Sequence, residues 1–551
     1  MSRPFPLERW SDGLFRATVA GRDSAPPSKH GTDGYHTLRD AGSMKESREP
    51  SEPTGGNSGH VFVVRGRIEL VAWDAVIVPT SNLFWPREIW WPALGITRFD
   101  ASAVSGAGRV RSFATDDGRP AWLLDVARYK NSSVGWLIDG LCAALSAIAA
   151  HRPTPGGGRV KPLVALPTLG VGQGGYGGVR GEVVQTLLAT TGAFAAENDI
   201  DVVFVVADAA DYAAFQSLRR ERAQTGATET LIDDLATKIR RGEVSLLLGA
   251  GVSIPAGLPT WSQLLGTLKA EMLQDISHDD FESLSVLDRA QLLSKSASPG
   301  TLGERVAKVA GAALRPTLAH CLLASLKTAK VVTTNYDTLY EDAFKAAHGD
   351  DAISVLPRED ADAERSWVLK MHGDVADPAS IVLSRRDFVR YDAERRPLGS
   401  IVQSLMATGH LLVIGASMTD DNVLRLAHEV LALNERNNRH RTLGTVITLR
   451  SDEIRSALWR HDFDYVGVST SLDDATAARD LEIFLDRIAM SASDEAPFLL
   501  DARYRELLDD EEVDLAATLR ASAQKVRALS SKGRDRWRML ETILEGLGAG
   551  Q

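Results

Sequence analysis

The most informative stretch of the chain reads Leu246-Leu-Leu-Gly-Ala-Gly-Val-Ser-Ile-Pro-Ala-Gly-Leu-Pro-Thr-Trp261. A short apolar run, Val244–Leu248, predicts a buried strand that ends in Gly249-Ala250-Gly251. We expect a helix to follow, so that the glycine turn and the helix N-terminus form a cradle for a pyrophosphate. Tight packing of the turn would need the same glycines, so the turn by itself does not settle the function.

Polar side chains also follow three other predicted strands of this half of the chain. They are Asn335 and Asp337, then His372, and then Gly415, Ser417 and Asp420. The carboxyl ends of parallel strands form the edge at which open α/β sheets bind ligands. Four strands therefore deliver glycine, amide, hydroxyl, carboxylate and imidazole groups to one edge, which packing alone hardly explains.

Composition restricts the function classes open to the chain. Its 551 residues allow three or four domains of ordinary size. The formal net charge of -11 argues against general nucleic-acid binding, which relies on an excess of Lys and Arg. Two cysteines, Cys142 and Cys321, are too few for a four-cysteine zinc site or a disulfide framework. We therefore expect no metal centre and a reducing, cytoplasmic setting.

The sequence predicts neither a membrane span nor a signal peptide. The most apolar helical segment, Val134–Ala150, carries Asp139 and has the spacing of a helix that packs on one side. The first residues include Arg3, Glu8 and Arg9 and lack an apolar core. We therefore expect no membrane partner.

Changes in composition along the chain predict four segments. Residues 1–59 are rich in Ser, Gly, Pro and Asp, and we expect a flexible N-terminal segment. Residues 60–222 and 228–490 alternate strands with helices, the pattern of two α/β domains. Residues 491–551 are a charged helical extension that packs or oligomerises. The expected strands are Val61–Val64, Ile68–Val71, Asp74–Val78, Ala121–Val126, Leu163–Leu166 and Asp201–Ala207, then Val244–Leu248, Lys330–Thr334, Trp367–Met371, His410–Ile414 and Thr445–Leu449.

The motif order in residues 228–490 resembles the sirtuin-like domains of bacterial antiphage defence proteins. The matching motifs are Gly-Ala-Gly-x-Ser with Gly-Leu-Pro-Thr-Trp261, Thr-x-Asn-Tyr-Asp337, Lys-x-His-Gly373 and Ile-Gly-x-Ser-x-x-Asp420. The resemblance implies a Rossmann-type fold that binds NAD and breaks its nicotinamide–ribose bond. It implies that Asn335 and His372 are catalytic. The positions that it implies for NAD contact are Gly249, Ala250, Gly251, Ser253, Thr260, Asp337, Gly415, Ser417 and Asp420.

Two departures from the family favour NAD hydrolysis over lysine deacylation. Protein-deacylating sirtuins carry a four-cysteine zinc module, which this chain cannot build, and their Pro-Asp-Phe-Arg is replaced here by Pro259-Thr-Trp261. In NAD hydrolysis we expect Asn335 to hold the ribose and the attacking water. Asp337 would orient the loop or the nicotinamide amide. His372, whose type titrates near neutrality, would act as general base.

Residues 60–222 resemble a macro domain, the fold that binds ADP-ribose. The matching segments are Gly66-Arg-Ile-Glu69, Asp74-Ala-Val-Ile-Val-Pro-Thr-Ser-Asn82 and Pro167-Thr-Leu-Gly-Val-Gly172. The last of these begins a loop with six glycines between Leu166 and Gly178, which predicts a phosphate cradle, the alternative being a mobile surface loop. The ligand-binding positions that the resemblance implies are Asn82, Gly170, Val171, Gly172, Gly174 and Gly175.

Two substitutions in this first α/β unit favour a sensor over an ADP-ribosyl hydrolase. Arg67 stands where macro domains have an aspartate that contacts adenine, and Pro79 replaces the first asparagine of the motif. A changed base contact would suit a modified or cyclic ADP-ribose signal.

The leading prediction is an NAD-depleting antiphage effector that is gated by a nucleotide bound to the macro-like unit. NAD is the substrate, an ADP-ribose-derived signalling nucleotide is the expected ligand, and a homo-oligomer and a defence-system partner protein are the expected assemblies. One alternative is a protein ADP-ribosyltransferase with a macro reader. The other is a non-catalytic NAD and ADP-ribose binding module of a larger assembly.

Overall fold

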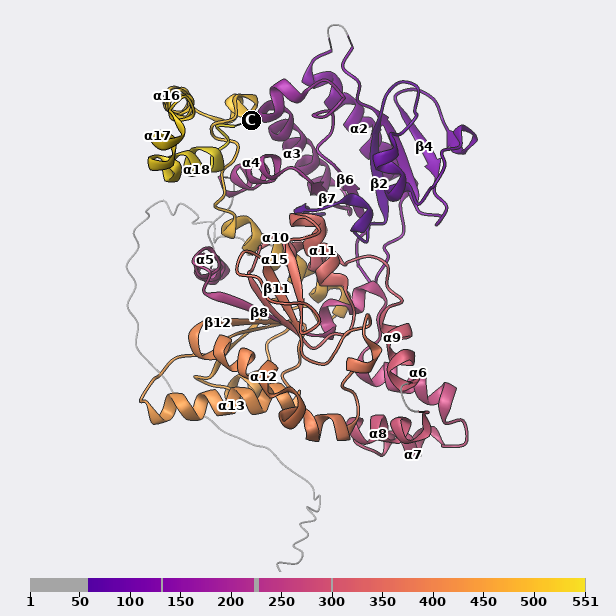
Figure 1. Ribbon diagram of the computed structural model, residues 1–551. Helices are drawn as coiled ribbons and strands as arrows, with labels where there is room; N and C mark the ends of the chain where they lie inside the picture. The colour runs from indigo at the N-terminus through magenta and orange to yellow at the C-terminus, as the bar shows by residue number, and fades with distance from the viewer. Residues whose placement is uncertain (1–57, 130–131, 222–226, 299–300, 551) are drawn as a thin grey trace, which may run out of the picture. The chain divides into compact units, whose positions relative to one another are not determined.

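The computed structural model describes residues 58–129, 132–221, 227–298 and 301–550. Nearly all of the expected N-terminal segment, residues 1–59, lies outside these described residues. The described part contains two seven-stranded sheets with helices packed around them (Figure 1). The chain is therefore of the α/β class, as expected.

The first sheet has the order β1-β7-β6-β2-β5-β4-β3. Neighbours from β1 to β5 run parallel, whereas β4 pairs antiparallel with β5 and with the edge strand β3. The strands are β1 (Val61–Arg65), β2 (Ala75–Thr80), β3 (Val104–Ser105), β4 (Val110–Ala114), β5 (Pro120–Asp125), β6 (Leu163–Leu166) and β7 (Asp201–Val206).

One face of the first sheet is covered by three helices whose apolar sides share a core with it. The α-helices of this half are α1 (Trp91–Leu94), α2 (Val134–His151), α3 (Arg180–Glu197) and α4 (Ala209–Arg220). Helix α2 is long and apolar enough to cross a membrane by length and composition. Its residues Leu137, Leu141, Leu145 and Ile148 are nevertheless buried in the protein core, as the helical spacing predicted.

The expected strand Ile68–Val71 is wrong, because the structure has a 3-10 turn over Ile68–Leu70. Strands β1 and β2 are separated in the sheet by β7 and β6, so the segment that joins them has to cross the sheet end. Ile68 is buried, and its carbonyl accepts a hydrogen bond of 3.1 Å from the Trp73 indole. The apolar residues of this segment therefore anchor a crossing connection.

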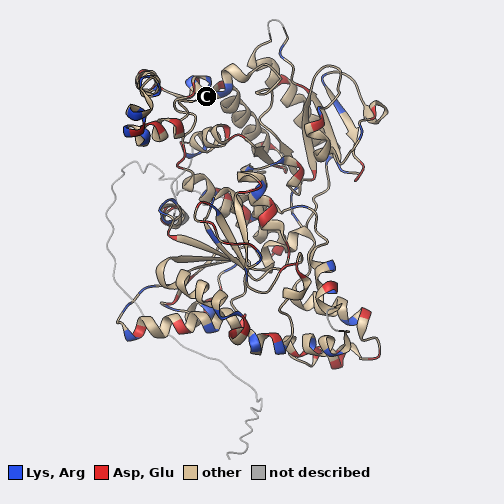
Figure 2. Cartoon of the chain, in the orientation of Figure 1, with Lys and Arg blue, Asp and Glu red and all other residues tan. Residues whose placement is uncertain are grey.

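The second sheet is parallel throughout, with the order β10-β11-β9-β8-β12-β13-β14. From the central strand β8 the chain first builds one side of the sheet and then returns to build the other, which creates a switch point beside β8. The strands are β8 (Val244–Leu248), β9 (Lys330–Thr333), β10 (Ile353–Leu356), β11 (Ser366–Lys370), β12 (His410–Ile414), β13 (Gly444–Thr448) and β14 (Phe463–Gly467). These strands carry few charged residues, in contrast to the helices around them (Figure 2).

Helices surround this second sheet and also form a small apolar cluster of their own beside it, which includes α6, α8 and α9. The α-helices are α5 (Ala227–Arg240), α6 (Trp261–Met272), α7 (His278–Glu282), α8 (Val286–Ser296), α9 (Thr301–Ala310), α10 (Leu318–Ser325), α11 (Leu339–His348), α12 (Arg385–Thr408), α13 (Asp421–Arg436), α14 (Glu453–Leu458) and α15 (Asp474–Ala492).

The helix expected directly after Gly251 is wrong in position. Two 3-10 turns, Ala250–Val252 and Ile254–Ala256, follow β8, and the α-helix α6 begins only at Trp261. Pro255 lies inside the second turn and Gly257 ends it with a φ of 84°. Because proline and left-handed glycine interrupt regular helix, the glycine turn does not lie at an α-helix N-terminus.

Helices α10, α11 and α15 contact strand β1 of the first sheet and belong to one apolar core that spans both halves. Buried charges on α15 add specific contacts. Asp486 is fully buried and accepts from His60 at 2.8 Å and from Arg219, while Arg479 lies 2.7 Å from Asp201. Breaking a buried ion pair costs about 3–5 kcal/mol, so these contacts hold the two halves in one arrangement.

The C-terminal part is helical, as expected, and packs against the first half. After a 3-10 segment, Ala502–Leu507, it contains α16 (Asp510–Arg527), α17 (Ser531–Arg536) and α18 (Arg538–Gly546). Tyr504 is fully buried, and its hydroxyl lies within hydrogen-bond distance of both Asp211 and Arg180. The extension therefore has its own small core and a polar anchor on α3 and α4.

Candidate functional site

A cavity of about 400 Å³ lies at the carboxyl ends of β8, β9, β11 and β12, beside the switch point of the second sheet. This is the position at which open α/β sheets bind ligands. Every site residue expected in this half of the chain lines it. They are Gly249, Ala250, Gly251, Ser253, Thr260, Asn335, Asp337, His372, Gly415, Ser417 and Asp420.

The glycine turns after β8 and β12 pack directly on each other. The Gly251 amide donates to the Gly415 carbonyl at 2.9 Å, and a Cβ on Gly249 would lie 2.5 Å from the same oxygen. Gly415 has a φ of 70°, and a Cβ there would lie 2.7 Å from Val252. Loop packing thus requires these glycines, and the same turns form the cavity wall. Tight packing and ligand binding are therefore compatible explanations of the glycine motif.

Ser253 is the centre of a buried hydrogen-bond network on the cavity floor. Its hydroxyl donates to Asp337 at 2.9 Å and accepts from the Asn335 amide at 3.1 Å. The His320 ring lies 3.4 Å away; burial lowers the pKa of His320 to about 4, so its ring is neutral. Its Nδ1 accepts from the Thr317 amide at 3.2 Å, which leaves the proton on Nε2, facing Ser253.

Asn335 presents one unpaired oxygen to the cavity. Its Nδ2 also donates to the Gly249 carbonyl at 3.1 Å, which fixes the orientation of the amide. Its Oδ1 is buried and has no hydrogen-bond partner among the described residues. A buried acceptor without a partner is costly, so this oxygen is placed to receive a donor from a ligand or water.

His372 is held at the cavity wall by a turn that only glycine allows. Gly373 has a φ of 94°, and a Cβ on it would lie 2.4 Å from the Ser380 carbonyl. The His372 Nε2 lies 3.3 Å from an Asp420 oxygen but has no partner of hydrogen-bond geometry in the described structure. Burial lowers the pKa of His372 below its ordinary value, and Asp420 opposes that shift. The ring is therefore neutral near pH 7 and can accept a proton.

The two carboxylate oxygens of Asp420 make different contacts. One oxygen, Oδ1, accepts from the amides of Asn422 and Val423 and caps α13, while Oδ2 faces His372. The cap fixes the carboxylate, so a proton gained by the His372 ring would be stabilised by a charge held in place. The sequence pointed to Asp420 as an NAD contact; its place beside the imidazole is a finding of the structure.

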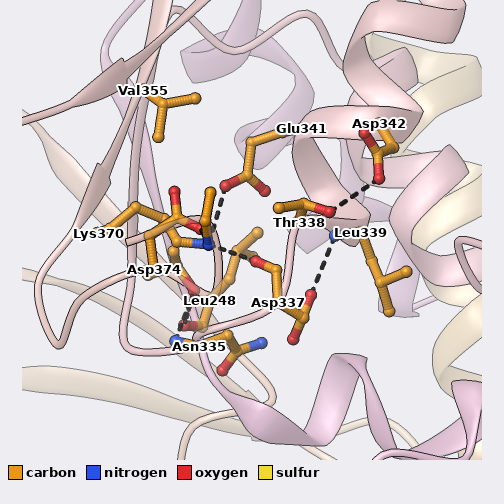
Figure 3. Close-up of polar contacts among 12 residues, drawn as sticks. Leu248, Asn335, Asp337, Thr338, Leu339, Glu341, Asp342, Val355, Lys370 and Asp374 are labelled. Carbon is orange, nitrogen blue, oxygen red and sulfur yellow. Dashed lines mark hydrogen bonds and ion pairs between the residues drawn. The ribbon is translucent and has the colours of Figure 1, made fainter. Parts of the chain in front are cut away.

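A buried ion pair supports the loop that carries Asn335 and Asp337 (Figure 3). Lys370 is 1% exposed, lies 2.9 Å from Glu341 and also donates to the Asp337 carbonyl. Burial alone would lower the pKa of Lys370, but the charges of Glu341, Asp337 and Asp374 outweigh it and raise the pKa. The ammonium therefore stays charged and fixes the loop main chain.

The sequence did not single out Lys370, Glu341, His320 or Trp261 as site residues. A usable signal existed for Lys370, because a lysine that continues an apolar strand must find a buried acidic partner. Glu341 lies four residues after Asp337 in α11 and supplies that partner. The Trp261 indole lines the cavity, and its buried Nε1 has no hydrogen-bond partner within the described residues. Nothing in a single sequence marks that donor.

In the first half the predicted ligand-binding residues also lie at neighbouring strand ends. Asn82 follows β2 and is exposed, and its main-chain amide donates to the Tyr129 hydroxyl at 3.3 Å. That hydroxyl donates to Asp125 at the end of β5. The loop after β6 holds Gly170, Val171, Gly172, Gly174 and Gly175, and the Gly174 carbonyl accepts from the Arg128 amide at 2.7 Å. The structure thus brings together the segments that follow β2, β5 and β6.

No group of three or more metal-ligating side chains occurs among the residues that the structure describes. Cys142 is exposed and Cys321 is buried, where burial raises the pKa of its thiol to about 12. The polar groups of the cavity are amides, hydroxyls, two carboxylates, an indole and an imidazole. That set suits an organic ligand with many oxygen and nitrogen atoms.

Comparison with known proteins finds one matching family model and several relatives that are similar to part of this chain. Residues 329–463 match the family model described as a SIR2-like domain. The NAD(+) hydrolase ThsA of Acinetobacter baumannii is 27% identical over 213 residues, 38% of this chain and 43% of that protein. The ThsA of Bacillus cereus is 26% identical over 241 residues, 43% and 49% of the two chains. Defense-associated sirtuin 2 of Bacillus subtilis is 27% identical over 218 residues, 37% and 21%.

One solved structure also resembles part of the chain. It is a macrodomain of Oceanobacillus iheyensis with MES bound, at 13% identity and a TM-score of 0.22, covering 30% of this chain and 93% of that one. A superposition of that quality adds nothing to the sheet order described above. The chain spans less than half the length of the curated relatives it matches. The half of the chain that holds the cavity thus contains a segment, residues 329–463, that is similar to a SIR2-like domain.

Proposed function

We propose that this protein hydrolyses NAD to ADP-ribose and nicotinamide and acts as an antiphage defence effector. The observation that carries the proposal is a pair of buried atoms in the walls of one cavity, Asn335 Oδ1 and His372 Nε2, which have no hydrogen-bond partner in the described part of the chain. An acceptor for a ribose hydroxyl and a neutral base for water are the two groups that this hydrolysis needs. The printed names of the relatives from Acinetobacter baumannii and Bacillus cereus, NAD(+) hydrolase, support the same reaction.

The proposed chemistry balances without a metal or a strong acid. The bond between the ribose C1′ and the pyridinium nitrogen breaks, and its electron pair neutralises the leaving nicotinamide. A water oxygen forms the new bond to C1′, and its proton passes to His372 Nε2. Asp420 then stabilises the imidazolium, whose proton returns to solvent. A positioned base typically accelerates such a step about 10²–10⁴-fold.

The residues that line the cavity suggest how each part of NAD would be bound. The packed turns at Gly249–Gly251 and Gly415 would lie along the pyrophosphate, because glycine has no side chain to keep the main chain away from it. Thr260, Ser417 and Asp337 add polar groups around the same space. Trp261 supplies an aromatic face and an unpaired indole donor among the described residues. This set would hold the dinucleotide while Asn335 fixes the ribose.

The first half is the proposed sensor. Its resemblance to a macro domain and the meeting of Asn82, Asp125 and the loop at Gly170–Gly175 support an ADP-ribose-type ligand at the carboxyl ends of β2, β5 and β6. The ligand would gate hydrolysis by binding the active arrangement better than the inactive one. The ion pairs that join α15 to the first half support such coupling.

The proposed setting is the cytoplasm, where NAD is available and thiols such as Cys142 stay reduced. We propose a homo-oligomer that forms through the C-terminal helices, where Trp537 and Met539 are 52% and 80% exposed. A defence-system partner protein would supply the signal. Light scattering of the full chain tests the oligomer; a monomer at all concentrations would exclude it.

One assay tests the proposed reaction. The purified full chain is incubated with NAD, with and without ADP-ribose derivatives, and the products are separated. Equal amounts of free nicotinamide and ADP-ribose support hydrolysis, whereas label transferred to protein would support the ADP-ribosyltransferase. Unchanged NAD with every derivative, while NAD still binds, would favour the non-catalytic binding module and overturn the proposal.

A further inference from the structure

A second cavity, of about 380 Å³, lies where the first sheet meets the sirtuin-like half. It is formed at the amino ends of β2, β5 and β6, the edge of the sheet opposite to Asn82 and the glycine-rich loop. Its walls come from six separate segments of the chain. Among the lining residues are Trp73, Asp74, Arg119, Gly157, Arg159, Pro255, Leu314, Arg315, Thr317 and Glu482.

Two arginines at this cavity share a single carboxylate. Arg119 lies 2.8 Å from Asp117, and both terminal nitrogens of Arg315 lie 3.3 Å from the same Asp117 oxygen. Two guanidinium groups therefore face one negative charge. The 2.8 Å contact is made by Arg119 Nη2, and Arg119 Nη1 donates to the Trp73 carbonyl at 2.8 Å. The pair thus retains one positive charge in excess of Asp117, which a bound anion would offset.

Trp73 holds these guanidinium groups in place. The Arg119 Cζ lies 3.5 Å from the centre of the indole ring and the Arg315 Cζ lies 5.7 Å from it. Stacking on an aromatic face fixes the plane of a guanidinium and leaves its edge free to bind an anion. Leu314, which is 86% exposed, and neighbouring alanines provide an apolar wall.

The acidic residues that line the cavity are occupied by other groups. Asp74 accepts from the amides of Gly156 and Leu163, each at 2.8 Å. Glu482 pairs with Arg159, which also lies 2.7 Å from Asp201. The Glu482 charge is thus offset by Arg159, and both Asp74 oxygens are occupied by main-chain amides. The Arg119 and Arg315 pair therefore determines which ligand charge the cavity favours.

The second cavity is connected to the first through a short chain of hydrogen bonds. Thr317 lines it and donates to the Val252 carbonyl at 3.2 Å, in the turn that follows β8. The Thr317 amide also fixes His320, whose Nε2 faces Ser253 at 3.4 Å. Ser253 contacts both Asn335 and Asp337. Pro255, two residues after Ser253, lies in the wall of the second cavity.

We propose that this second cavity binds a small phosphate-bearing molecule with an apolar portion, and that the bound ligand alters the first cavity through Thr317, His320 and Ser253. The Arg119 and Arg315 pair binds the phosphate, and the wall at Leu314 contacts the apolar portion. The binding site itself does not depend on the proposed NAD hydrolysis, whereas the effect on catalysis rests on it.

Calorimetric titration of the full chain with inorganic pyrophosphate tests the binding site. Arg315→Ala is expected to remove one bound ion per chain or to weaken binding at least tenfold. Arg315→Lys keeps the charge but loses the two-pronged contact, so it should bind with intermediate affinity. Arg538→Ala removes an exposed, ion-paired arginine of α18 and serves as the matched control. Unchanged stoichiometry and affinity in Arg315→Ala, or no binding to the unaltered chain, overturns the site.

A second titration identifies the ligand chemistry. AMP should bind more tightly than inorganic phosphate, because its base and sugar can contact the apolar wall, and Arg315→Ala should weaken both. Equal affinities of AMP and phosphate would contradict the proposed contact between an apolar portion of the ligand and the wall at Leu314. The cavity would then be a simple phosphate site.

The effect on catalysis is measured as the KM for NAD with and without saturating AMP. We expect a change of at least twofold in the unaltered chain and in Arg538→Ala, and none in Arg315→Ala. Thr317→Val should bind AMP but lose the change in KM, while Thr317→Ser, which keeps the hydroxyl, should retain it. AMP that binds without any change in KM overturns the connection. If NAD is not hydrolysed at all, the calorimetric result still decides the binding site by itself.

Discussion

The two halves of the molecule use glycine at strand ends in the same way but leave different groups unpaired. In the second half, Gly249, Gly251 and Gly415 pack loop against loop, and a cavity with unpaired atoms of Asn335 and His372 lies beside them. In the first half, a Cβ on Gly174 would lie 2.7 Å from Gly170. There the main-chain amide of Asn82 and the Asp125 carboxylate share the Tyr129 hydroxyl, Arg128 binds the Gly174 and Gly175 carbonyls, and Thr168 Oγ1 has no partner among the described residues. Unpaired buried atoms, more than glycine count, therefore indicate where each half could take a ligand.

The largest effect should come from removing the two unpaired groups of the second half. Asn335→Ala and His372→Ala should each lower kcat about 10²–10⁴-fold, because a positioned catalytic group contributes about that much. Nicotinamide release measures the rate, and circular dichroism checks the fold. Asn82→Ala in the first half is the matched control and should keep the rate of the fully activated enzyme. Full activity in either of the two cavity variants would remove the assigned role.

The buried pair beneath the loop should matter nearly as much, and for two separable reasons. Lys370→Met leaves Glu341 buried and alone, so the free energy of unfolding should fall by about 3–5 kcal/mol. Adding Glu341→Leu should restore most of that stability, because apolar residues of similar volume replace a buried pair well. Activity should stay low in the double variant, since the Asp337 carbonyl still lacks its donor. Recovery of both properties together would show that the pair is only structural.

Glycine substitutions in the first half should have a smaller effect. Gly174→Ala places a Cβ against the Gly170 main chain, and such overpacking costs about 1–3 kcal/mol of unfolding free energy. At Gly172 a Cβ would meet nothing within 4 Å, so Gly172→Ala is the matched control and should change stability by less than about 0.5 kcal/mol. Urea denaturation compares the two. Equal stabilities would mean that the loop is not closed on itself.

The smallest expected change is a shift in the pH profile. The His372 ring is the proposed base in its neutral form, so kcat/KM should fall as pH drops through its pKa, which burial holds below the ordinary value. Asp420 raises that pKa, and Asp420→Asn should therefore move the acidic limb to lower pH while keeping the cap on α13. Asp421→Asn, at the exposed neighbouring position, is the control. If the acidic limb stays at the same pH in Asp420→Asn, the Asp420 charge does not influence the titration of His372.

Much of the fold and the placement of the candidate site could be predicted from the sequence, because parallel strands bring polar residues at their carboxyl ends to one edge. That reasoning located Asn335, His372 and Asp420 around one cavity. It could not locate Glu341 or His320, whose importance depends on packing between helices distant in the chain. It also misread Ile68–Val71, since apolar residues anchor a crossing connection as readily as a strand. Strands at or next to a sheet edge, such as β14 and β4, were missed for a related reason, because much of their surface is not buried.

Helix α15 has a consequence for the ancestry of this architecture. Its Glu482 and Asp486 belong to the sirtuin-like half in sequence, but their partners Arg159, Arg219 and His60 belong to the other half. Exchange of either half by recombination would leave these charges buried in an apolar layer without their partners. New sensor modules can therefore join this domain only when the helix changes with them, so the two halves should be inherited as a single unit.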